Sequence, residues 1–224
     1  MKHKITKICL GFILIHSLFG QFPTLIGIKV DFQEEIEDDP KTSGNGKFLL
    51  SIENVTDRCN EGSFLIDAPP HNSEYFLAQL KSAANYYKSV SNSLVNFNNY
   101  VILDSIYTAN NVMSHYGQGD SYLVELFSEV VTIASEDLQE VLSDSDIDSY
   151  LLVVFHAGLG QDVSVPFIDP TSHDLKSAYI DEYMFHDAMI DPPELNGDLV
   201  NRGLLLPETQ NMIYYEVSDD IFPG

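Results

Sequence analysis

Basic residues are scarce in this sequence. Its 224 residues include 11 lysine and arginine residues against 34 aspartate and glutamate residues, which gives a net charge of −23. A nucleic-acid-binding surface needs basic side chains to neutralise phosphates, and an anionic membrane surface attracts the same kind of residue. The composition therefore predicts a soluble acidic protein that has neither nucleic acid nor an anionic membrane as its partner.

Cysteine and long apolar runs are scarce as well. The one sustained apolar run covers residues 8–18, follows a start with three lysines and precedes the small residue Gly20. This order is typical of a Sec-type signal peptide, and the run is well short of the ~20 residues that a spanning helix needs. We expect residues 1–20 to be removed before Gln21, and the mature protein to be secreted to the extracellular space or the cell surface. No later segment predicts a membrane span.

Removal of this leader changes the composition of the mature chain. Three of the 11 basic residues and Cys9 leave with it, so the net charge becomes −26 and Cys59 is the only cysteine. An intramolecular disulfide is then impossible, and the chain depends on its core or on bound cations. Carboxylates suit calcium, which makes calcium a possible cofactor held by the acidic loops around residues 144–148 and 162–174, although surplus acidic charge also serves solubility alone.

The apolar pattern predicts an α/β domain over residues 21–224. We expect strands at residues 24–32, 48–52, 94–106, 150–155 and 203–206, helices at 72–92 and 121–138, and a loop at 110–119. Asn72 or Ser73 is the expected N-cap of the first helix, and Ser121 that of the second. The expected buried helix positions are Phe76, Leu80, Ala83 and Tyr87 in the first helix, and Leu123, Leu126, Phe127, Val130, Ala134 and Leu138 in the second. Alternation of strands and helices favours a mixed sheet packed with helices, followed by a loop-rich region after Gly158.

Short catalytic motifs are absent from the sequence. There is no His-Glu-x-x-His, no G-x-S-x-G and no phosphate-binding loop, and no two mature histidines have the spacing of a local zinc pair. Residues 144–148 begin like a calcium loop, but Ser149 and Phe155 stand where an EF-hand needs Gly and Glu. A solvated connection is the simpler interpretation of this acidic segment.

The residues after the predicted strand 150–155 are candidates for a site. His156, Gly158, Gln161 and Asp162 follow a buried strand, where α/β proteins often place functional groups. A tight turn with a hydrogen-bonded histidine explains the same residues equally well.

Two further groups of residues have weaker support from their spacing. Asp169, His173 and Asp174 offer oxygen and nitrogen ligands close together in the chain, and Glu208 follows a short strand that we expect Pro207 to stop. Each group also fits an ordinary turn.

Several segments in a fixed order resemble a known family. They are residues 30–33, 44–48, 69–72, 75–76, 85–87, 90–91, 155–158, 160–162, 169–171, 173–174, 177–180 and 206–209. Together they are similar to the N-terminal half of the catalytic domain of immune-inhibitor-A-like secreted metallopeptidases, peptidase family M-six. The most specific part is the His-Ala-Gly sequence after a buried strand, with Pro-Glu-Thr downstream.

This resemblance implies a zincin-like α+β fold, incomplete at its C-terminus, and protein or peptide substrates. In the family a later helix carries His-Glu-x-x-His, whose histidines hold zinc and whose glutamate activates water. No catalytic or zinc residue of the family maps onto this sequence, so we expect a fragment truncated before the zinc helix that folds poorly alone. The alternative is a non-catalytic, exported, zincin-like binding domain.

Overall fold

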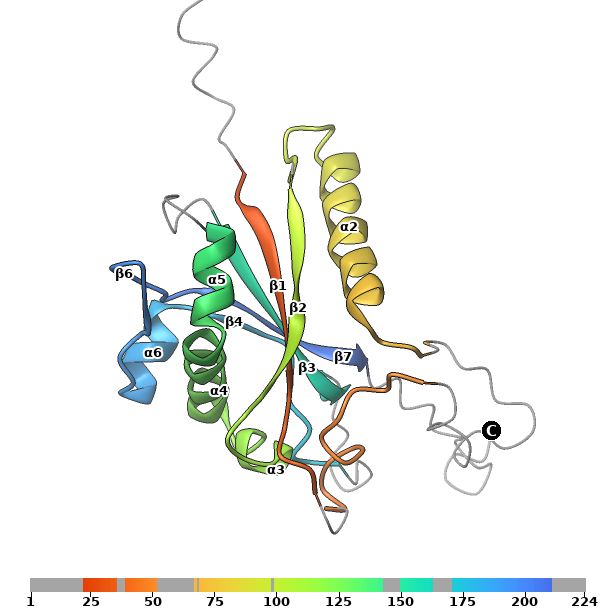
Figure 1. Ribbon diagram of the computed structural model, residues 1–224, viewed down its shortest axis with the longest axis vertical. Coiled ribbons are helices and arrows are strands. Elements are labelled where there is room, and N and C mark those ends of the chain that lie inside the picture. Colours follow the sequence, from red (N-terminus) through yellow and green to blue (C-terminus); the bar gives the residue numbers. More distant parts are fainter. Residues whose placement is uncertain are drawn as a thin grey trace, which may run out of the picture.

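The computed structural model describes residues 22–35, 39–51, 67, 69–97, 99–142, 150–162 and 171–210. The expected signal peptide therefore lies outside the described residues. The elements in chain order (Figure 1) are β1 (Thr24–Asp31), α2 (Ser73–Val90), β2 (Tyr100–Thr108), α3 (Met113–Tyr116), α4 (Asp120–Ile133), α5 (Ser135–Leu142), β3 (Tyr150–Gly160), β4 (Ala178–Ile180), α6 (Glu182–Ala188), β5 (Glu194–Leu195), β6 (Asp198–Leu199) and β7 (Gly203–Gln210).

The central sheet has five strands in the order β2-β1-β3-β7-β4. The pairs β1–β2, β1–β3 and β3–β7 are parallel, and only β4 runs antiparallel, beside β7. The predicted mixed α/β sheet is thus confirmed. Because four strands run the same way, their carboxyl ends meet at one edge of the sheet, which we call the carboxyl edge.

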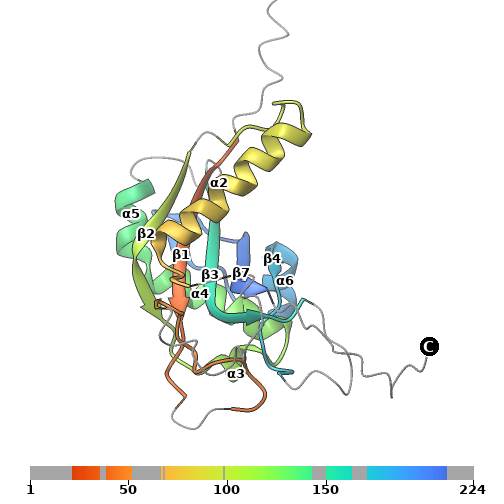
Figure 2. The same cartoon turned by 90° about the vertical axis from the view of Figure 1, so that its right-hand side faces the viewer.

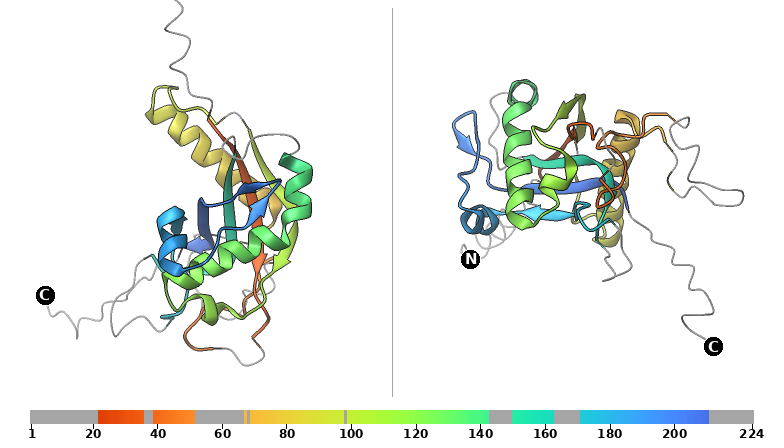
Figure 3. Two further views of the ribbon diagram at one scale, coloured as in Figure 1. Left: turned by 90° about the vertical axis from the view of Figure 1, so that its left-hand side faces the viewer. Right: turned by 90° about the horizontal axis from the view of Figure 1, so that it is seen from below.

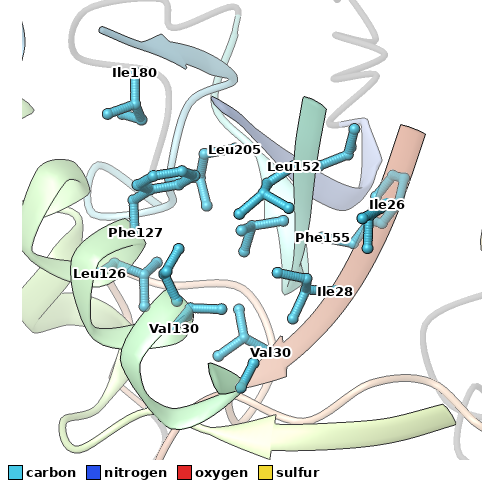
Figure 4. Packing of buried hydrophobic residues seen from close by; sticks show 14 of the residues in the cluster. Ile26, Ile28, Val30, Leu126, Phe127, Val130, Leu152, Phe155, Ile180 and Leu205 are labelled. Carbon is cyan, nitrogen blue, oxygen red and sulfur yellow. The ribbon is translucent and has the colours of Figure 1, made fainter. Parts of the chain in front are cut away.

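Helices cover both faces of this sheet. Helix α2 lies across one face, and α4 and α5 lie on the other, as the two turned views show (Figures 2 and 3). On the α2 face the rings of Phe76 and Phe155 pack with centroids 4.6 Å apart. On the α4 face Leu126 and Val130 point toward Ile28 and Val30 (Figure 4). Both faces of β1 are therefore buried, as expected of a central parallel strand.

Helix α2 begins where its sequence signal predicts. Asn72 caps it, because the Asn72 Oδ1 accepts the N–H groups of Glu74 and Tyr75 at 3.0 and 3.1 Å. The predicted stripe is partly wrong: Phe76 and Leu80 are buried, but Ala84 rather than Ala83 continues the buried face. Tyr87 is 49% exposed. A helix that touches the sheet along only part of its length leaves its last turns in solvent.

The second predicted helix is two helices. Helix α4 ends at Ile133 and α5 starts at Ser135, with Ala134 between them. The N-cap of α4 is Gly119, which makes no side-chain cap hydrogen bond, so the predicted cap at Ser121 is wrong. The six positions predicted to be buried on these helices are all buried. The predicted loop at 110–119 contains the one-turn helix α3.

Three predicted strands have different boundaries in the structure. Strand β2 starts at Tyr100 rather than residue 94, and β3 continues past residue 155 to Gly160. Strand β7 continues through Pro207. On the β4 side of β7, pairing ends at Leu205, so no strand on that side needs the N–H that Pro207 lacks.

Residues 48–51 form no strand. The Leu49 carbonyl accepts the N–H of His71 at 2.8 Å, and the Leu49 N–H binds a side chain at the carboxyl edge, so its backbone groups are used elsewhere. The region after Gly158 is less loop-rich than predicted, since it holds β4, α6 and the β5–β6 hairpin.

Within the described residues, none of the helices combines the length and apolar character needed to cross a bilayer.

Candidate functional site

Glu208 organises the carboxyl edge of the sheet. It lies near the end of β7 and is only 3% exposed. Its Oε1 accepts hydrogen bonds from the Leu49 N–H and from the His71 ring, both at 2.7 Å. Its Oε2 accepts the Gly158 N–H at 2.9 Å. One buried carboxylate thus fastens three segments that are far apart in the sequence.

His71 is the second member of this cluster. Its side chain is fully buried, and because a carboxylate only accepts hydrogen bonds when ionised, Nδ1 carries the proton that binds Glu208. The other ring nitrogen, Nε2, lies 3.9 Å from Asp67 Oδ1, beyond hydrogen-bond distance. A carboxylate that holds one imidazole nitrogen fixes the tautomer and leaves the lone pair on the other.

Tyr75 closes the cluster from helix α2. Its ring packs on His71 with centroids 4.4 Å apart, and its hydroxyl lies 2.5 Å from Asp67 Oδ2 and 3.2 Å from the Glu208 carbonyl oxygen. Burial, followed by the hydrogen bond with Asp67, raises the pKa of the Tyr75 hydroxyl well above its usual value. Tyr75 therefore remains a protonated donor at any physiological pH.

Gly158 reaches Glu208 through a bulge in β3. The register with β7 shifts between His156 and Leu159, so three steps along β3 match two along β7. Gly158 has φ of +93° in this bulge, and a Cβ there would lie 2.9 Å from the Met113 Cε. The position therefore requires glycine for both its backbone conformation and its space.

His156 lies on the opposite face of the sheet from this cluster. It is fully buried, its ring centroid is 6.1 Å from that of Phe32, and its Nδ1 donates to the Ala157 carbonyl at 2.9 Å. Burial lowers the pKa of His156 to about 4, although the Ala157 hydrogen bond and the charge of Asp162 act in the other direction. His156 is therefore neutral at pH 7, and its Nε2 has no hydrogen-bond partner among the described residues.

Asp174 is a second buried carboxylate at the carboxyl edge. It is 2% exposed, and its Oδ1 accepts the Ser43 N–H at 2.7 Å. The Ser43 Oγ in turn accepts the Leu159 N–H at 3.0 Å, and the His173 N–H donates to the Lys41 carbonyl at 2.8 Å. These bonds tie the loop around residue 42 to the end of β3.

A shallow pocket of about 170 Å³ lies beside Asp174. Its lining includes Gln161, Asp174 and the turn that leads into α4, and a 2.7 Å ion pair between Lys176 and Asp120 lies at the same place. The Gln161 side chain donates to the Thr171 carbonyl at 3.0 Å, while Asp162 accepts from the Ser177 N–H and hydroxyl at 2.7 and 2.6 Å. These side chains shape and stabilise the loops around the pocket.

The sequence candidates thus form two groups. Glu208 and Gly158 meet on the α2 side, and Gln161 and Asp174 line the pocket. Asp162 and His173 hold the neighbouring loops through Ser177 and Lys41, and His156 belongs to neither group. Asp169 lies outside the described residues, so its place stays open. The sequence identified neither His71, Tyr75 nor Asp67 as a site residue, because their only local signal is a helix start.

The described residues do not fit a zinc ion. Nowhere in this part of the chain do three His, Cys, Asp or Glu side chains lie close enough together to hold a metal. His71 and Glu208 already use Nδ1 and both carboxylate oxygens in hydrogen bonds. Among the calcium candidates, Asp162 is engaged by Ser177, and the acidic segment 144–148 lies outside the described residues.

Three comparisons with known proteins were negative, so the functional argument rests on the contacts at the carboxyl edge. The chain matches no protein-family model, no curated protein and no solved structure.

Proposed function

We propose that this chain forms the front part of an exported, zinc-peptidase-like domain. In this proposal the described residues build the scaffold of the carboxyl edge and supply none of the zinc ligands. The observation that carries it is the convergence of the resembling segments on Glu208. Residues 48, 71, 158 and 208 belong to four of these segments, and Glu208 bonds directly to two of them and to Leu49, the neighbour of the third.

The mixed sheet packed with helices also supports this proposal, since the resemblance implies a zincin-like fold with a mixed sheet and helices. Substrates would be proteins or peptides, and the protein would work outside the cell. The scaffold role gives the buried His71 and Glu208 a task that needs no metal. They hold the loop at Leu49, the segment before α2 and the β3 bulge in one rigid unit.

A second function is a non-catalytic, exported binding domain of the same architecture. It is favoured by one observation: the part of the chain that the structure describes has no group of side chains placed to hold a metal. The two functions differ in a property that can be measured directly, because only the first requires zinc and peptide-bond cleavage.

The test uses protein secreted from the complete coding sequence. Purified protein should contain zinc by elemental analysis and should cleave casein, and 1,10-phenanthroline should abolish cleavage. Glu208→Gln should destabilise the protein by about 1–3 kcal/mol, because a buried N–H loses its acceptor, yet leave the zinc content of the folded protein unchanged. Glu194→Gln, at the exposed first residue of β5, is the matched control.

Zinc-loaded, folded protein that leaves casein intact would overturn the peptidase proposal in favour of the binding domain. Loss of zinc from folded Glu208→Gln, with Glu194→Gln unaffected, would contradict the scaffold role and make Glu208 part of the metal centre.

A further inference from the structure

A buried lysine lies beside a serine on the α2 face of the sheet. Lys29 is in β1, two residues before its end, and is only 3% exposed. Its Nζ lies 2.6 Å from the Ser73 Oγ and 2.9 Å from the Asp104 carbonyl oxygen. This pair is separate from Glu208 and from the pocket beside Asp174.

Two features of the fold bring this pair together, a bulge in β2 and the start of α2. Strand β2 bulges where Gly27 pairs with Ile102 but Lys29 pairs with Ile106, so the backbone around Asp104 leaves the ladder and its carbonyl turns to Lys29. Helix α2 begins at Ser73, which brings the first hydroxyl of the helix onto the amine.

The surroundings of Lys29 favour a neutral amine. An ammonium group has three N–H donors, but only two hydrogen-bond partners surround Nζ among the described residues. In the structure Nζ donates to both the Ser73 Oγ and the Asp104 carbonyl. A neutral amine can keep the bond to Asp104 and, at the same 2.6 Å distance, accept the Ser73 O–H through its lone pair. The partial positive charge at the start of α2 also opposes a cation there.

The pKa of Lys29 agrees with this arrangement. Burial lowers it, and the carboxylate of Asp104, which acts in the other direction, has the smaller effect. A lysine of lowered pKa that receives the proton of a neighbouring hydroxyl is the base of a serine–lysine pair.

Ser73 is accessible to a reagent and lies at the start of α2. It is only partly buried, so a reagent can reach it, whereas Lys29 is enclosed. The start of an 18-residue helix places partial positive charge beside its oxygen, while the N–H groups of Glu74 and Tyr75 already bind the Asn72 side chain. The partial positive charge stabilises negative charge that develops on an attacking oxygen.

We propose that Ser73 and Lys29 form a nucleophile–base pair that reacts with esters. The Ser73 Oγ attacks the ester carbonyl carbon while its proton passes to the neutral Lys29 Nζ. The tetrahedral adduct then breaks its bond to the alcohol oxygen, which takes the proton from Lys29, and the acyl group stays on Ser73. Attack by water, with the proton again passing through Lys29, releases the acid and restores both side chains.

A purely structural role predicts a different outcome. If the Ser73–Lys29 hydrogen bond only anchors α2 to β1, the fold depends on it but no covalent acyl-serine forms. Covalent labelling of Ser73 therefore separates the two roles independently of stability, zinc content or casein cleavage.

The test treats the full secreted protein with p-nitrophenyl acetate and maps acetylation by peptide mass spectrometry. Ser73 should be acetylated faster than Ser82, an exposed serine of the same helix. Lys29→Met and Lys29→Arg should each slow Ser73 acetylation about 100-fold or more, since general-base catalysis contributes about 10²- to 10⁴-fold. Ser73→Ala should remove this label, and Ser82→Ala should leave it unchanged.

The pH profile adds a readout that anchoring alone does not move. The Ser73 acetylation rate should rise with pH as Lys29 loses its proton, and it should level off below pH 10.5, the ordinary lysine pKa. Among the described residues, Asp104 is the one charged group that acts on Lys29. The proposal is overturned if folded wild-type protein acetylates Ser73 no faster than Ser82. It is equally overturned if folded Lys29→Arg keeps the wild-type rate of Ser73 acetylation. The comparison of Ser73 with Ser82 in the wild-type protein remains a test even where a Lys29 variant fails to fold.

Discussion

At the scale of single residues, His156 shows how burial alone sets a proton affinity. Burial lowers its pKa from 6.5 to about 4 in the folded protein, whereas in the unfolded chain the ring is solvated and keeps its ordinary value. Between these values the unfolded state binds a proton that the folded state does not. Neutral His156 therefore contributes its full share of stability above pH 6.5, and this share falls as the pH drops toward 4.

We expect replacement of His156 by Gln to flatten the acid dependence of stability. The wild type should lose about 3 kcal/mol more than His156→Gln between pH 7 and pH 4, since one pKa unit corresponds to about 1.4 kcal/mol. Urea unfolding at pH 7, 5.5 and 4 measures the difference. His186→Gln replaces a histidine that is 87% exposed and is the control. Parallel curves for wild type and His156→Gln would refute the burial argument.

Glu208 shows which site residues the sequence reveals and which it hides. Its place after an apolar run predicts an acidic group at the end of a strand, and that much is correct. Its hydrogen-bond partners lie 50, 137 and 159 residues away in the chain. No periodicity or spacing encodes such long-range pairs, because they arise only when the sheet brings distant loops to one edge.

At the scale of elements, local signals predict well where neighbours do not intervene. Helix α2 starts at its Asn cap, and β1 follows its apolar run, because caps and burial are properties of short segments. Strand β7 passes through Pro207, against the prediction, because β4 no longer pairs there and only β3 lies beside the proline, as at a sheet edge. Residues 48–51 fail as a strand because the Leu49 N–H binds the Glu208 side chain and the Leu49 carbonyl accepts the His71 N–H.

The β3 bulge offers a prediction at this scale. Gly158→Ala places a methyl group 2.9 Å from Met113 Cε at a φ of +93°, whereas Gly197→Ala has nearly the same φ, +90°, with nothing within 4 Å. Both variants carry the backbone strain of a left-handed alanine, about 1 kcal/mol. Only Gly158→Ala must also displace Met113 and lengthen the bond to Glu208.

We therefore expect Gly158→Ala to lower the free energy of unfolding by about 1–3 kcal/mol more than Gly197→Ala, because overpacking adds to the strain. Chemical denaturation of the two variants side by side is the measurement. Equal losses would mean that the bulge yields without cost and that its contact with Glu208 is dispensable.

At the scale of the whole molecule, surplus negative charge opposes the compact state. The mature chain carries a net charge of −26 once the expected leader is removed, and few lysines or arginines offset it. Repulsion between exposed carboxylates extends about 30 Å at 0.01 M ionic strength and about 10 Å at 0.1 M. Salt should therefore stabilise this protein, the opposite of what a fold held by surface ion pairs would show.

We expect the melting temperature to rise by about 2–4 °C between 10 and 150 mM NaCl, which corresponds to about 1 kcal/mol in a chain of this size. A double variant, Glu182→Gln with Asp191→Asn, removes two exposed carboxylates and should melt higher at low salt and respond less to NaCl. Calcium and magnesium chloride at equal ionic strength separate screening from binding. If screening is the whole effect, calcium and magnesium chloride raise the melting temperature alike. A rise with calcium alone would instead indicate a specific cation site among the acidic loops. A melting temperature independent of NaCl would show that the carboxylates lie too far apart to repel one another.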